Sequence, residues 1–407
     1  MKKNLALLRV GDKSVELEVE KSSYGPDAID VRKLYKELGY FTYDPGFFST
    51  ASCRSSITFI DGESGVLRYR GHDILDIVEK HDFLDVAHLL FFSHFPDEQE
   101  RKKFVAEIKK YSTLDKQIVS MIEGLPFNSH PMAVLISAIT LLVVLYPGFD
   151  VEESFYLLLA KIPIILSAYY QHSIGCKIES IHYTDSYAKN FLYNMLGADD
   201  EDFAYAIEKF LILHADHEQN ASTSTARMVC STQAPIISCI SSAVCSLWGA
   251  LHGGANEKVI HMIERIVMSG KSFDDVLQNI KDPGSNFRLM GFGHRVYKNY
   301  DPRAKVLKDI CDKLSNSETL LISQEMFDMA TKLESHALQD EYFKKRSLYP
   351  NVDFYSGLIL KGIGVPVDMF TTLFVMGRVV GWLSQIKEMT EDSDTKLYRP
   401  RQVYQGE

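Results

Sequence analysis

The chain has 407 residues, 46% of them hydrophobic and 24% charged. This length and balance predict a soluble globular protein with one large or two unequal domains. The formal net charge of −10 argues against a general nucleic-acid-binding protein, because phosphate binding requires a basic face. The six cysteines form no C-x-x-C pair, which is typical of small buried thiols in a reducing compartment.

Strand-like patterns are confined mainly to the first seventy residues. Residues 14–20 alternate strictly between polar and apolar side chains, and the preceding Gly-Asp-Lys supplies a turn. A second hairpin is predicted from residues 57–60 to 66–69 across the turn Asp-Gly-Glu-Ser-Gly. Both hairpins are short, so we expect them to pack on something larger.

Helical periodicity dominates the rest of the chain. The apolar run at 132–146 falls short of the roughly 20 residues that a membrane span needs, so it predicts a buried helix. Residues 234–248 are apolar on all sides, as in a helix packed all round, with a second subunit as one candidate neighbour. The apolar stretch after Lys2 and Lys3 ends at Arg9, which is too short for a signal peptide. We therefore predict a mainly α fold with a small N-terminal β element, and a cytoplasmic protein that does not bind membranes.

Four of the thirteen histidines lie in unusual local settings. His214 and His217 are three residues apart, so on a helix they would share a face and could bind a metal. However, H-E-x-x-H is absent and no third ligand is placed beside them, so a polar or substrate-contacting role is favoured. His252 precedes Gly253-Gly254 at the start of a helical run, where the helix dipole disfavours protonation. A neutral imidazole there can donate a hydrogen bond to a carbonyl, although a histidine in a glycine-rich turn is the simpler alternative.

The fourth histidine, His294, lies in Gly-Phe-Gly-His-Arg-Val. This is a poor dinucleotide fingerprint, because the sixth position is Val296 and no strand pattern precedes the motif. Basic side chains crowd around it in an acidic chain, which favours an anion site. These are Arg288, Arg295, Lys298, Arg303 and Lys305.

Two further charged residues have apolar surroundings. Asp353 is flanked by apolar and aromatic residues, which would raise its pKa as a general base requires, although an aspartate at a helix start can also be an N-cap. Arg378 lies in an apolar helical segment and needs a carboxylate partner, either internal or on a substrate. Arg399 and Arg401 alone look like part of an ordinary polar tail.

The ordered set of HADHEQNAS, LHGGANE, RLMGFGHRVYKNYDPRA, LYPNVDFYSG and RPRQ resembles the citrate synthase family over nearly the whole chain. The N-terminal extension resembles the larger form found in Gram-negative bacteria. The resemblance implies a β-rich element at 1–70 packed on a large helical domain, 71–262 plus 371–407. It also implies a small helical domain, 263–370, that closes over oxaloacetate.

The resemblance implies a specific reaction. Acetyl-CoA condenses with oxaloacetate, and citryl-CoA is hydrolysed to citrate and CoA, the entry step of the tricarboxylic acid cycle. Asp353 would remove a methyl proton, His252 would hydrogen-bond the thioester oxygen, and His294 would polarise the ketone. No metal or cofactor is implied, since acetyl-CoA is a substrate. A thioester methyl is a weak acid, so its deprotonation has to be coupled to stabilisation of the oxygen where charge develops.

The family's binding residues also map onto this sequence. Oxaloacetate would be held by His217, Arg303, Arg378 and, from a partner subunit, Arg399, so that a homodimer is the minimum assembly and a hexamer (a trimer of dimers) the alternative. CoA would lie against Arg288, Leu289, Met290, Gly291, Gly293, Lys298 and Arg346.

Regulation and two alternative functions remain to be weighed. Gram-negative relatives are often allosteric enzymes inhibited by NADH at a separate basic site. Here Leu157 replaces an expected arginine while Tyr146 and Lys161 remain, so we expect weak or no NADH inhibition. 2-Methylcitrate synthase, which uses propionyl-CoA, is the nearest alternative and is disfavoured by the N-terminal β element. A catalytically silent CoA-binding protein is disfavoured because all the family's polar residues are present together.

Overall fold

The structure, a computed structural model, describes residues 4–178, 186–293, 297, 301–315 and 319–407. The chain divides into two compact units, Met1–Ser56 with Tyr398–Glu407, and Ile57–Leu397. Each unit has its own secondary structure, and the larger one contains nearly all of the helices.

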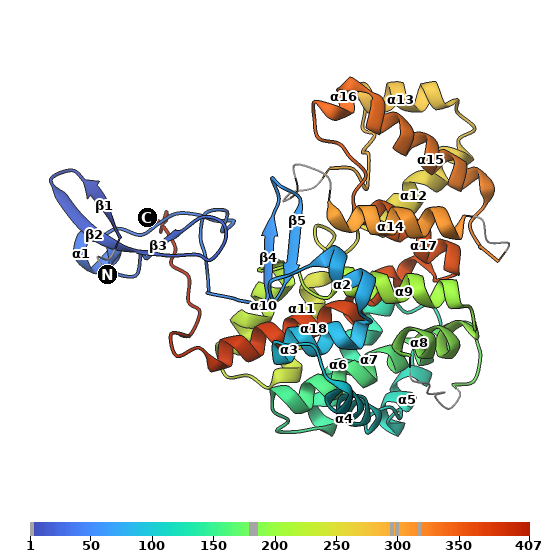
Figure 1. Cartoon of the computed structure of the whole chain (residues 1–407), viewed down its shortest axis with the longest axis horizontal. Coiled ribbons are helices and arrows are strands. Elements are labelled where there is room, and N and C mark those ends of the chain that lie inside the picture. The colour runs from blue at the N-terminus through green and yellow to red at the C-terminus, as the bar shows by residue number, and fades with distance from the viewer. Residues whose placement is uncertain (1–3, 179–185, 294–296, 298–300, 316–318) are drawn as a thin grey trace. The chain divides into compact units, whose positions relative to one another are not determined.

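The smaller unit is built on an antiparallel hairpin. Strand β1 (Leu5–Val10) pairs with β2 (Lys13–Glu20), in a register that runs from Leu5 opposite Glu18 to Val10 opposite Lys13. Strand β3 (Ala28–Ile29) adds to the other edge of β2, and helix α1 (Leu34–Leu38) follows. This confirms the first predicted hairpin, drawn in dark blue in Figure 1.

A second small sheet opens the larger unit. Strand β4 (Thr58–Asp61) pairs antiparallel with β5 (Val66–Tyr69), and β6 (His72–Asp73) continues the sheet. This is the second predicted hairpin. The buried Tyr69 hydroxyl donates to the carbonyl oxygen of Asp216 at 3.0 Å, so the sheet is attached to the segment that carries the HADHEQN motif.

The rest of the larger unit is helical, which confirms the mainly α fold with small N-terminal β sheets. The α-helices are α2 (Ile74–Lys80), α3 (Phe83–Phe92), α4 (Glu98–Lys109), α5 (Lys116–Glu123), α6 (Pro131–Leu145), α7 (Val151–Ser173), α8 (Tyr187–Leu196), α9 (Glu201–His214), α10 (Ala221–Cys230), α11 (Ile236–Leu247), α12 (Ala255–Met268), α13 (Phe273–Lys281), α14 (Pro302–Leu314), α15 (Gln324–Gln339), α16 (Glu341–Lys344), α17 (Val352–Ile363) and α18 (Phe370–Glu391). A 3-10 turn, η1 (Val367–Met369), precedes α18.

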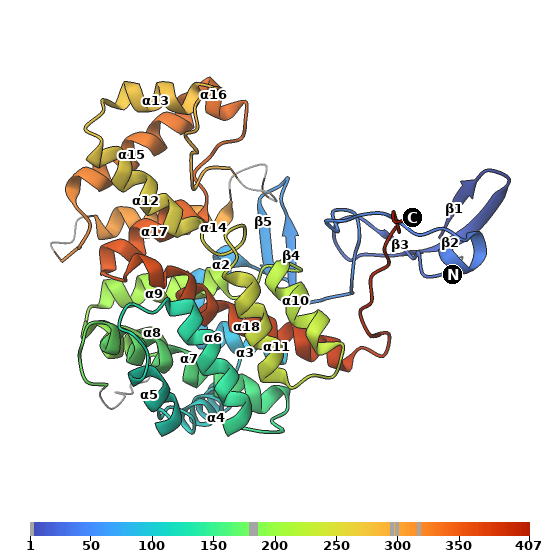
Figure 2. The same cartoon turned by 180° about the vertical axis from the view of Figure 1, so that it is seen from behind.

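Helix α18 is the central element of this unit. It packs against α3, α7, α9, α10 and α11, and Figure 2 shows it running through the middle of the helices. The segment Val367–Glu391 is long and apolar enough to cross a membrane, but its most apolar stretch is entirely buried. It is therefore the core helix of a soluble protein rather than a membrane span.

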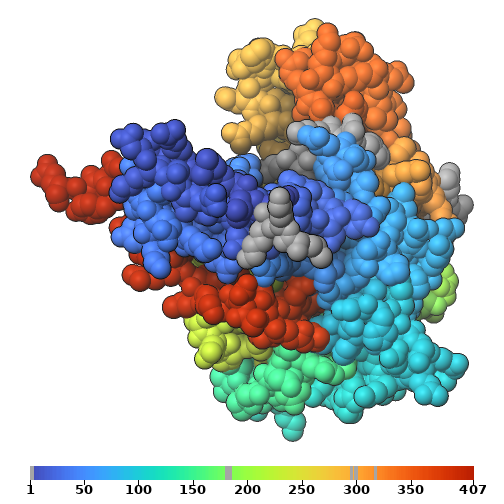
Figure 3. Space-filling view, turned by 60° about the vertical axis from the view of Figure 1, so that its left-hand side comes forward, coloured from blue at the N-terminus to red at the C-terminus, as the bar shows by residue number. Residues whose placement is uncertain are grey.

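Helices α12 to α17 gather at one end of the larger unit, beyond α9 and α18 (Figures 1 and 2). In the space-filling view the gold and orange part of this group stands out as a lobe (Figure 3). Helix α17 packs on α14 and α12, and α12 also packs on α15. The group therefore has contacts of its own while α17 and α14 both reach α9.

Candidate active site

One face of α18 organises the polar groups beside it. Arg378 and Trp382 are one helical turn apart and so lie on the same face. The Arg378 Nε donates to the backbone carbonyl of His214 at 2.7 Å. The Trp382 indole N–H donates to the Ser222 hydroxyl at 3.2 Å. The core helix thus holds both the end of α9 and the start of α10.

His214 and His217 do not share a helical face. Helix α9 ends at His214, and His217 lies in the turn beyond it. His214 is buried with its Nδ1 bonded to the Phe210 carbonyl at 2.7 Å, and burial lowers the pKa of His214 well below its usual value. Within the described part of the chain no third metal ligand joins the two histidines. The His217 ring lies instead beside Tyr297, with ring centroids 6.0 Å apart.

His252 is positioned by the start of α10. Its Nε2 accepts the backbone N–H of Ser222 at 3.3 Å and lies 2.9 Å from the Ser222 hydroxyl. A nitrogen that accepts an N–H carries a lone pair, so the ring proton is on Nδ1. The helix N-terminus that faces His252 is therefore that of α10, whereas the sequence suggested the helix that follows it. A side chain at Gly253 would put Cβ 2.3 Å from the Leu247 carbonyl oxygen, so the turn requires glycine there.

Asp353 lies in the first turn of α17 but does not cap the helix. Asn351 is the N-cap, and its side-chain oxygen accepts the Asp353 N–H at 3.0 Å. The Asp353 side chain thus remains available for other chemistry. Burial raises the pKa of Asp353 to about 6, although Arg303 and Arg378 both act to lower it. A carboxylate with this pKa is ionised at neutral pH and is a stronger base than an exposed aspartate.

The glycine loop that leads to His294 is fixed to the same helix start. The Asn351 backbone N–H donates to the Gly291 carbonyl at 2.9 Å, and its side-chain amide donates to the Gly293 carbonyl at 2.7 Å. Gly291 has a φ of 78°, and a Cβ there would lie 2.6 Å from the Val259 side chain. His294 and Lys298 themselves fall outside the described residues.

Two buried arginines lie in the electrostatic neighbourhood of Asp353. Arg303 is only 3% exposed and pairs with Asp301, with Nε 3.0 Å from Oδ1 and one terminal nitrogen 2.9 Å from Oδ2. Its guanidinium also lies 5.6 Å from the Tyr297 ring centroid, the ring that neighbours His217. Arg378 has its pKa lowered by burial, with the Asp216 carboxylate acting in the opposite direction. The structure therefore brings His217, Arg303, Arg378 and Asp353 into one polar region.

The predicted CoA residues divide into two groups. Arg288 and Met290 line a cavity of about 410 Å³ together with Arg265 and Lys271, which the sequence analysis did not select. Arg265 lies in the last turn of α12 and Lys271 follows the helix, so in the sequence both look like ordinary solvent-exposed cations. Arg346 does not line this cavity, because its guanidinium stacks over Tyr342 at 4.0 Å.

Leu289, Gly291 and Gly293 belong to the same loop as Arg288 and Met290, but they are not among the residues that line the cavity. Arg399 is exposed and belongs to the smaller unit, whereas the other described site residues belong to the larger one.

The fold and the site together define a class of protein: a mainly helical enzyme whose site combines a histidine, a carboxylate of raised pKa and buried arginines. A family model described as "Citrate synthase, C-terminal domain" matches residues 46–401. The chain belongs to the citrate synthase family.

Solved structures agree with this assignment. Citrate synthase from Pyrobaculum aerophilum is 34% identical with a TM-score of 0.78, over 89% of this chain and 92% of that one. Citrate synthase from the thermophilic archaeon Thermoplasma acidophilum, solved as a ternary complex with carboxymethyl coenzyme A and oxaloacetate, is 32% identical with a TM-score of 0.80, over 88% of this chain and 94% of that one. Citrate synthase from Thermotoga maritima MSB8 is 34% identical with a TM-score of 0.76, over 90% and 96%.

Proposed function

We propose that this chain carries out the citrate synthase reaction with Asp353 and His252 as the groups that act on acetyl-CoA. Citrate synthase activity itself follows from the family and the fold. The observation that carries the assignment of residues is the Ser222–His252 contact at 3.3 Å, which supports a neutral histidine that donates through Nδ1. Asp353, with its raised pKa, supplies the base.

The two groups would act together on the thioester. Asp353 would take a proton from the methyl carbon while the His252 Nδ1–H donates to the thioester oxygen, where negative charge develops. A neutral donor suits this task, because it stabilises the enolate without competing with Asp353 as an acid. His294 would polarise the ketone of oxaloacetate, and water would then hydrolyse citryl-CoA to citrate and CoA.

The buried arginines support the proposed oxaloacetate site. A dicarboxylate is matched by the guanidinium forks of Arg303 and Arg378, which bind carboxylates in a bidentate way. His217, beside Tyr297, would add a further polar contact. Arg399, which is exposed in its own unit, would complete the site from a partner subunit.

The cavity beside α12 supports a place for CoA. Arg265, Lys271 and Arg288 line it, and none of its described lining residues is a carboxylate. Three cations around one cavity suit the phosphates of CoA. The loop through Leu289, Met290, Gly291 and Gly293 would lie along the rest of the CoA molecule. Lys298 and Arg346 would face its phosphate groups from outside the cavity.

The grouping of α12 to α17 in Figure 1 supports a small domain at 263–370, with the large domain formed by 71–262 and 371–407. Closure of one domain over the other would keep the enolate and citryl-CoA away from bulk water. Asp353 and the glycine loop would then move together, because Asn351 ties them to each other.

Self-association is supported by the smaller unit. It exposes large apolar side chains, among them Leu7, Tyr43 and Phe48, which are 69%, 79% and 94% exposed. Apolar surface of this kind marks an interaction site, and we assign it to a homodimer or a hexamer of cytoplasmic subunits.

The β1–β2 hairpin lies before the start of the family match at residue 46, which supports the larger form known from Gram-negative bacteria.

Weak or absent inhibition by NADH is supported by the surroundings of Lys161. Its ammonium lies 2.6 Å from a carboxylate oxygen of Asp115 and donates to the Thr113 carbonyl at 2.6 Å. Lys161 is 1% exposed and Leu157 is fully buried, so neither side chain faces solvent where a dinucleotide could bind. Addition of NADH to the active enzyme would test this, and strong inhibition that salt relieves would contradict it.

The direct test is release of free CoA thiol from acetyl-CoA, with and without oxaloacetate. We expect release only when oxaloacetate is present, and folded protein without such release would overturn the proposal. The ratio of kcat/KM for acetyl-CoA and propionyl-CoA would separate a citrate synthase from a 2-methylcitrate synthase. His294→Ala should lower both turnover and oxaloacetate binding.

A further inference from the structure

Three potential metal ligands meet where α3 is joined to α4, in a part of the molecule that the reaction does not use. His88 lies on α3, His94 in the connecting loop, and Glu100 in the first turn of α4. One ring nitrogen from each histidine and one carboxylate oxygen lie within 4.8 Å of one another. We propose that these three residues bind a divalent transition-metal ion of the zinc class.

Backbone carbonyls orient both imidazole rings for this role. The His88 Nδ1 is 2.9 Å from the His94 carbonyl oxygen, and the His94 Nδ1 is 3.0 Å from the Phe92 carbonyl oxygen. Because a carbonyl only accepts, each Nδ1 carries the proton, and in the neutral ring the lone pair is on Nε2. An N–H donated to a carbonyl is the usual second contact of a metal-binding histidine.

The carboxylate is held in place as well. Glu100 closes a capping box with Asp97, in which one of its carboxylate oxygens accepts the Asp97 backbone N–H at 2.9 Å. The other oxygen accepts the Nε2–H of His94 at 3.0 Å, so this ring holds a proton on both nitrogens, and a metal ion would replace the proton on Nε2. The helix cap therefore uses one oxygen and presents the second to the histidines.

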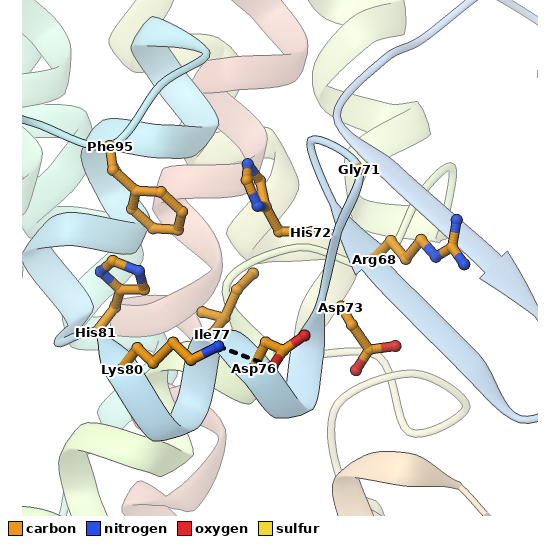
Figure 4. Close-up of a pocket in the computed structure, with 9 residues that line it drawn as sticks. All are labelled: Arg68, Gly71, His72, Asp73, Asp76, Ile77, Lys80, His81 and Phe95. Carbon is orange, nitrogen blue, oxygen red and sulfur yellow. Dashed lines mark hydrogen bonds and ion pairs between the residues drawn. The ribbon is translucent and has the colours of Figure 1, made fainter.

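The connecting loop is anchored by the residue that follows His94. The Phe95 ring stacks on His81 with centroids 3.7 Å apart and meets the edge of His72 at 5.1 Å. Figure 4 shows these three rings in the wall of a cavity, whose volume is about 410 Å³. Because Phe95 is packed in this way, the backbone of the adjacent His94 is restricted before the metal binds. This restriction lowers the entropic cost of metal binding.

Two imidazoles and one carboxylate suit Zn²⁺, Co²⁺ or Ni²⁺, whereas Mg²⁺ and Ca²⁺ prefer oxygen ligands. Bonds of about 2.0–2.1 Å require the ligand atoms to move together by roughly 1 Å. His94 and Glu100 have exposed side chains that allow this movement, while His88 is only 5% exposed and supplies the fixed side of the site. Water would occupy the fourth position. The bound ion would cross-link the end of α3 and the start of α4.

The test is titration of chelator-treated, full-length enzyme with Zn²⁺, followed by calorimetry and by the melting temperature. We expect one strong site per chain and a rise in Tm, no such rise with Mg²⁺, and a visible d–d spectrum when Co²⁺ is used. His94→Gln and Glu100→Gln should each weaken Zn²⁺ binding by at least about tenfold. Glu100→Gln keeps an oxygen for the capping box, and both positions are exposed, so these variants should fold.

The matched control is His261→Gln. His261 is also exposed and lies 3.3 Å from a carboxylate oxygen of Glu264, but this pair is not part of a described three-ligand group. We expect His261→Gln to bind Zn²⁺ like the unaltered chain. Equal Zn²⁺ binding by the His94, Glu100 and His261 variants, or the absence of a strong site in the unaltered chain, would overturn the proposal.

Discussion

The backbone N–H of Ser222 donates to the Nε2 of His252 across 3.3 Å. This contact determines which nitrogen of the histidine carries its proton, because an acceptor nitrogen cannot also be a donor. It comes from the first turn of α10, so the positive end of that helix also disfavours a second proton on the ring. A contact between two segments thirty residues apart thus defines the electronic state of the group assigned to the thioester oxygen.

Loss of the His252 side chain should abolish most turnover. We expect His252→Ala to lower kcat by about 10²–10³-fold, the cost of removing one donor from a developing oxyanion. The dissociation constant for oxaloacetate should stay within about twofold, because His252 is assigned to the other substrate. Steady-state kinetics and calorimetry would measure both quantities.

Ser222→Ala is the matched control for that variant. It removes the hydroxyl but keeps the backbone N–H that holds Nε2, so kcat should fall by less than about tenfold. A loss as large as that of His252→Ala would show that the hydroxyl, rather than the N–H, controls the ring.

Asp353→Asn should remove activity and stabilise the fold. The pKa of Asp353 is about 6 in the folded chain, against about 3.9 in an unfolded one, so the folded state binds a proton more tightly between these values. The contribution of this group to the free energy of unfolding is therefore present at low pH and is lost as the pH rises. The loss reaches about 3 kcal/mol above pH 6. The amide cannot ionise and avoids this loss.

Urea denaturation at pH 8 and near pH 4 would measure the effect. We expect the gain of Asp353→Asn over the unaltered chain to be largest at pH 8 and to shrink toward pH 4. The exposed Asp309 on α14 provides the control, since Asp309→Asn should show no comparable dependence on pH. A destabilised Asp353→Asn at pH 8 would contradict the raised pKa.

The pH dependence of the rate should report the same group. The base must be ionised, so kcat/KM for acetyl-CoA should fall about tenfold per pH unit below a pKa near 6. Circular dichroism at each pH would show that the protein stays folded. An acidic limb near pH 4 would indicate an ordinary carboxylate and count against Asp353 as the desolvated base.

The sequence predicted those features that depend on local chemistry. Alternation and turn residues were sufficient for both hairpins, and the apolar neighbours of Asp353 correctly indicated desolvation. The end of α9 at His214 was not predicted. Beyond it, Glu218 adopts a φ of 50° and its carboxylate accepts the N–H of Ile60, in β4. That tertiary contact has no local signal.

The partners of the charged groups were harder to predict for the same reason. Arg265 and Lys271 gain a common role only when the loop through Arg288 folds back beside them. Arg346 was selected by its place in the motif region, yet the nearby Tyr342 ring holds its guanidinium. The sequence shows which residue types are present, whereas the direction of long flexible side chains depends on packing.

A side chain at Gly291 should disturb the loop beside α17. Gly291→Ala would combine a positive φ with a Cβ placed 2.6 Å from Val259 and 3.1 Å from the Phe354 backbone. We expect a loss of about 1–3 kcal/mol in the free energy of unfolding and a raised KM for acetyl-CoA. Gly270→Ala is the control, since Gly270 also has a positive φ, of 62°, but has open space around its Cβ position. Equal losses in both variants would mean that backbone strain alone matters.

The cavity lined by Arg265, Lys271 and Arg288 should distinguish CoA from shorter thioesters. If these cations bind phosphate groups, Lys271→Gln and Arg288→Gln should each raise KM for acetyl-CoA severalfold and leave kcat nearly unchanged, because a contact far from the reacting carbon contributes equally to ground and transition states. Acetyl-pantetheine lacks the nucleotide phosphates, so its KM should not change in either variant.

Added salt should raise KM for acetyl-CoA in the unaltered enzyme and less so in the variants, since screening weakens exposed charge pairs. Lys332→Gln, at an exposed position on α15, should behave like the unaltered enzyme with both thioesters. A parallel rise in KM for acetyl-CoA and acetyl-pantetheine would instead place these side chains against the pantetheine arm or assign them a structural role.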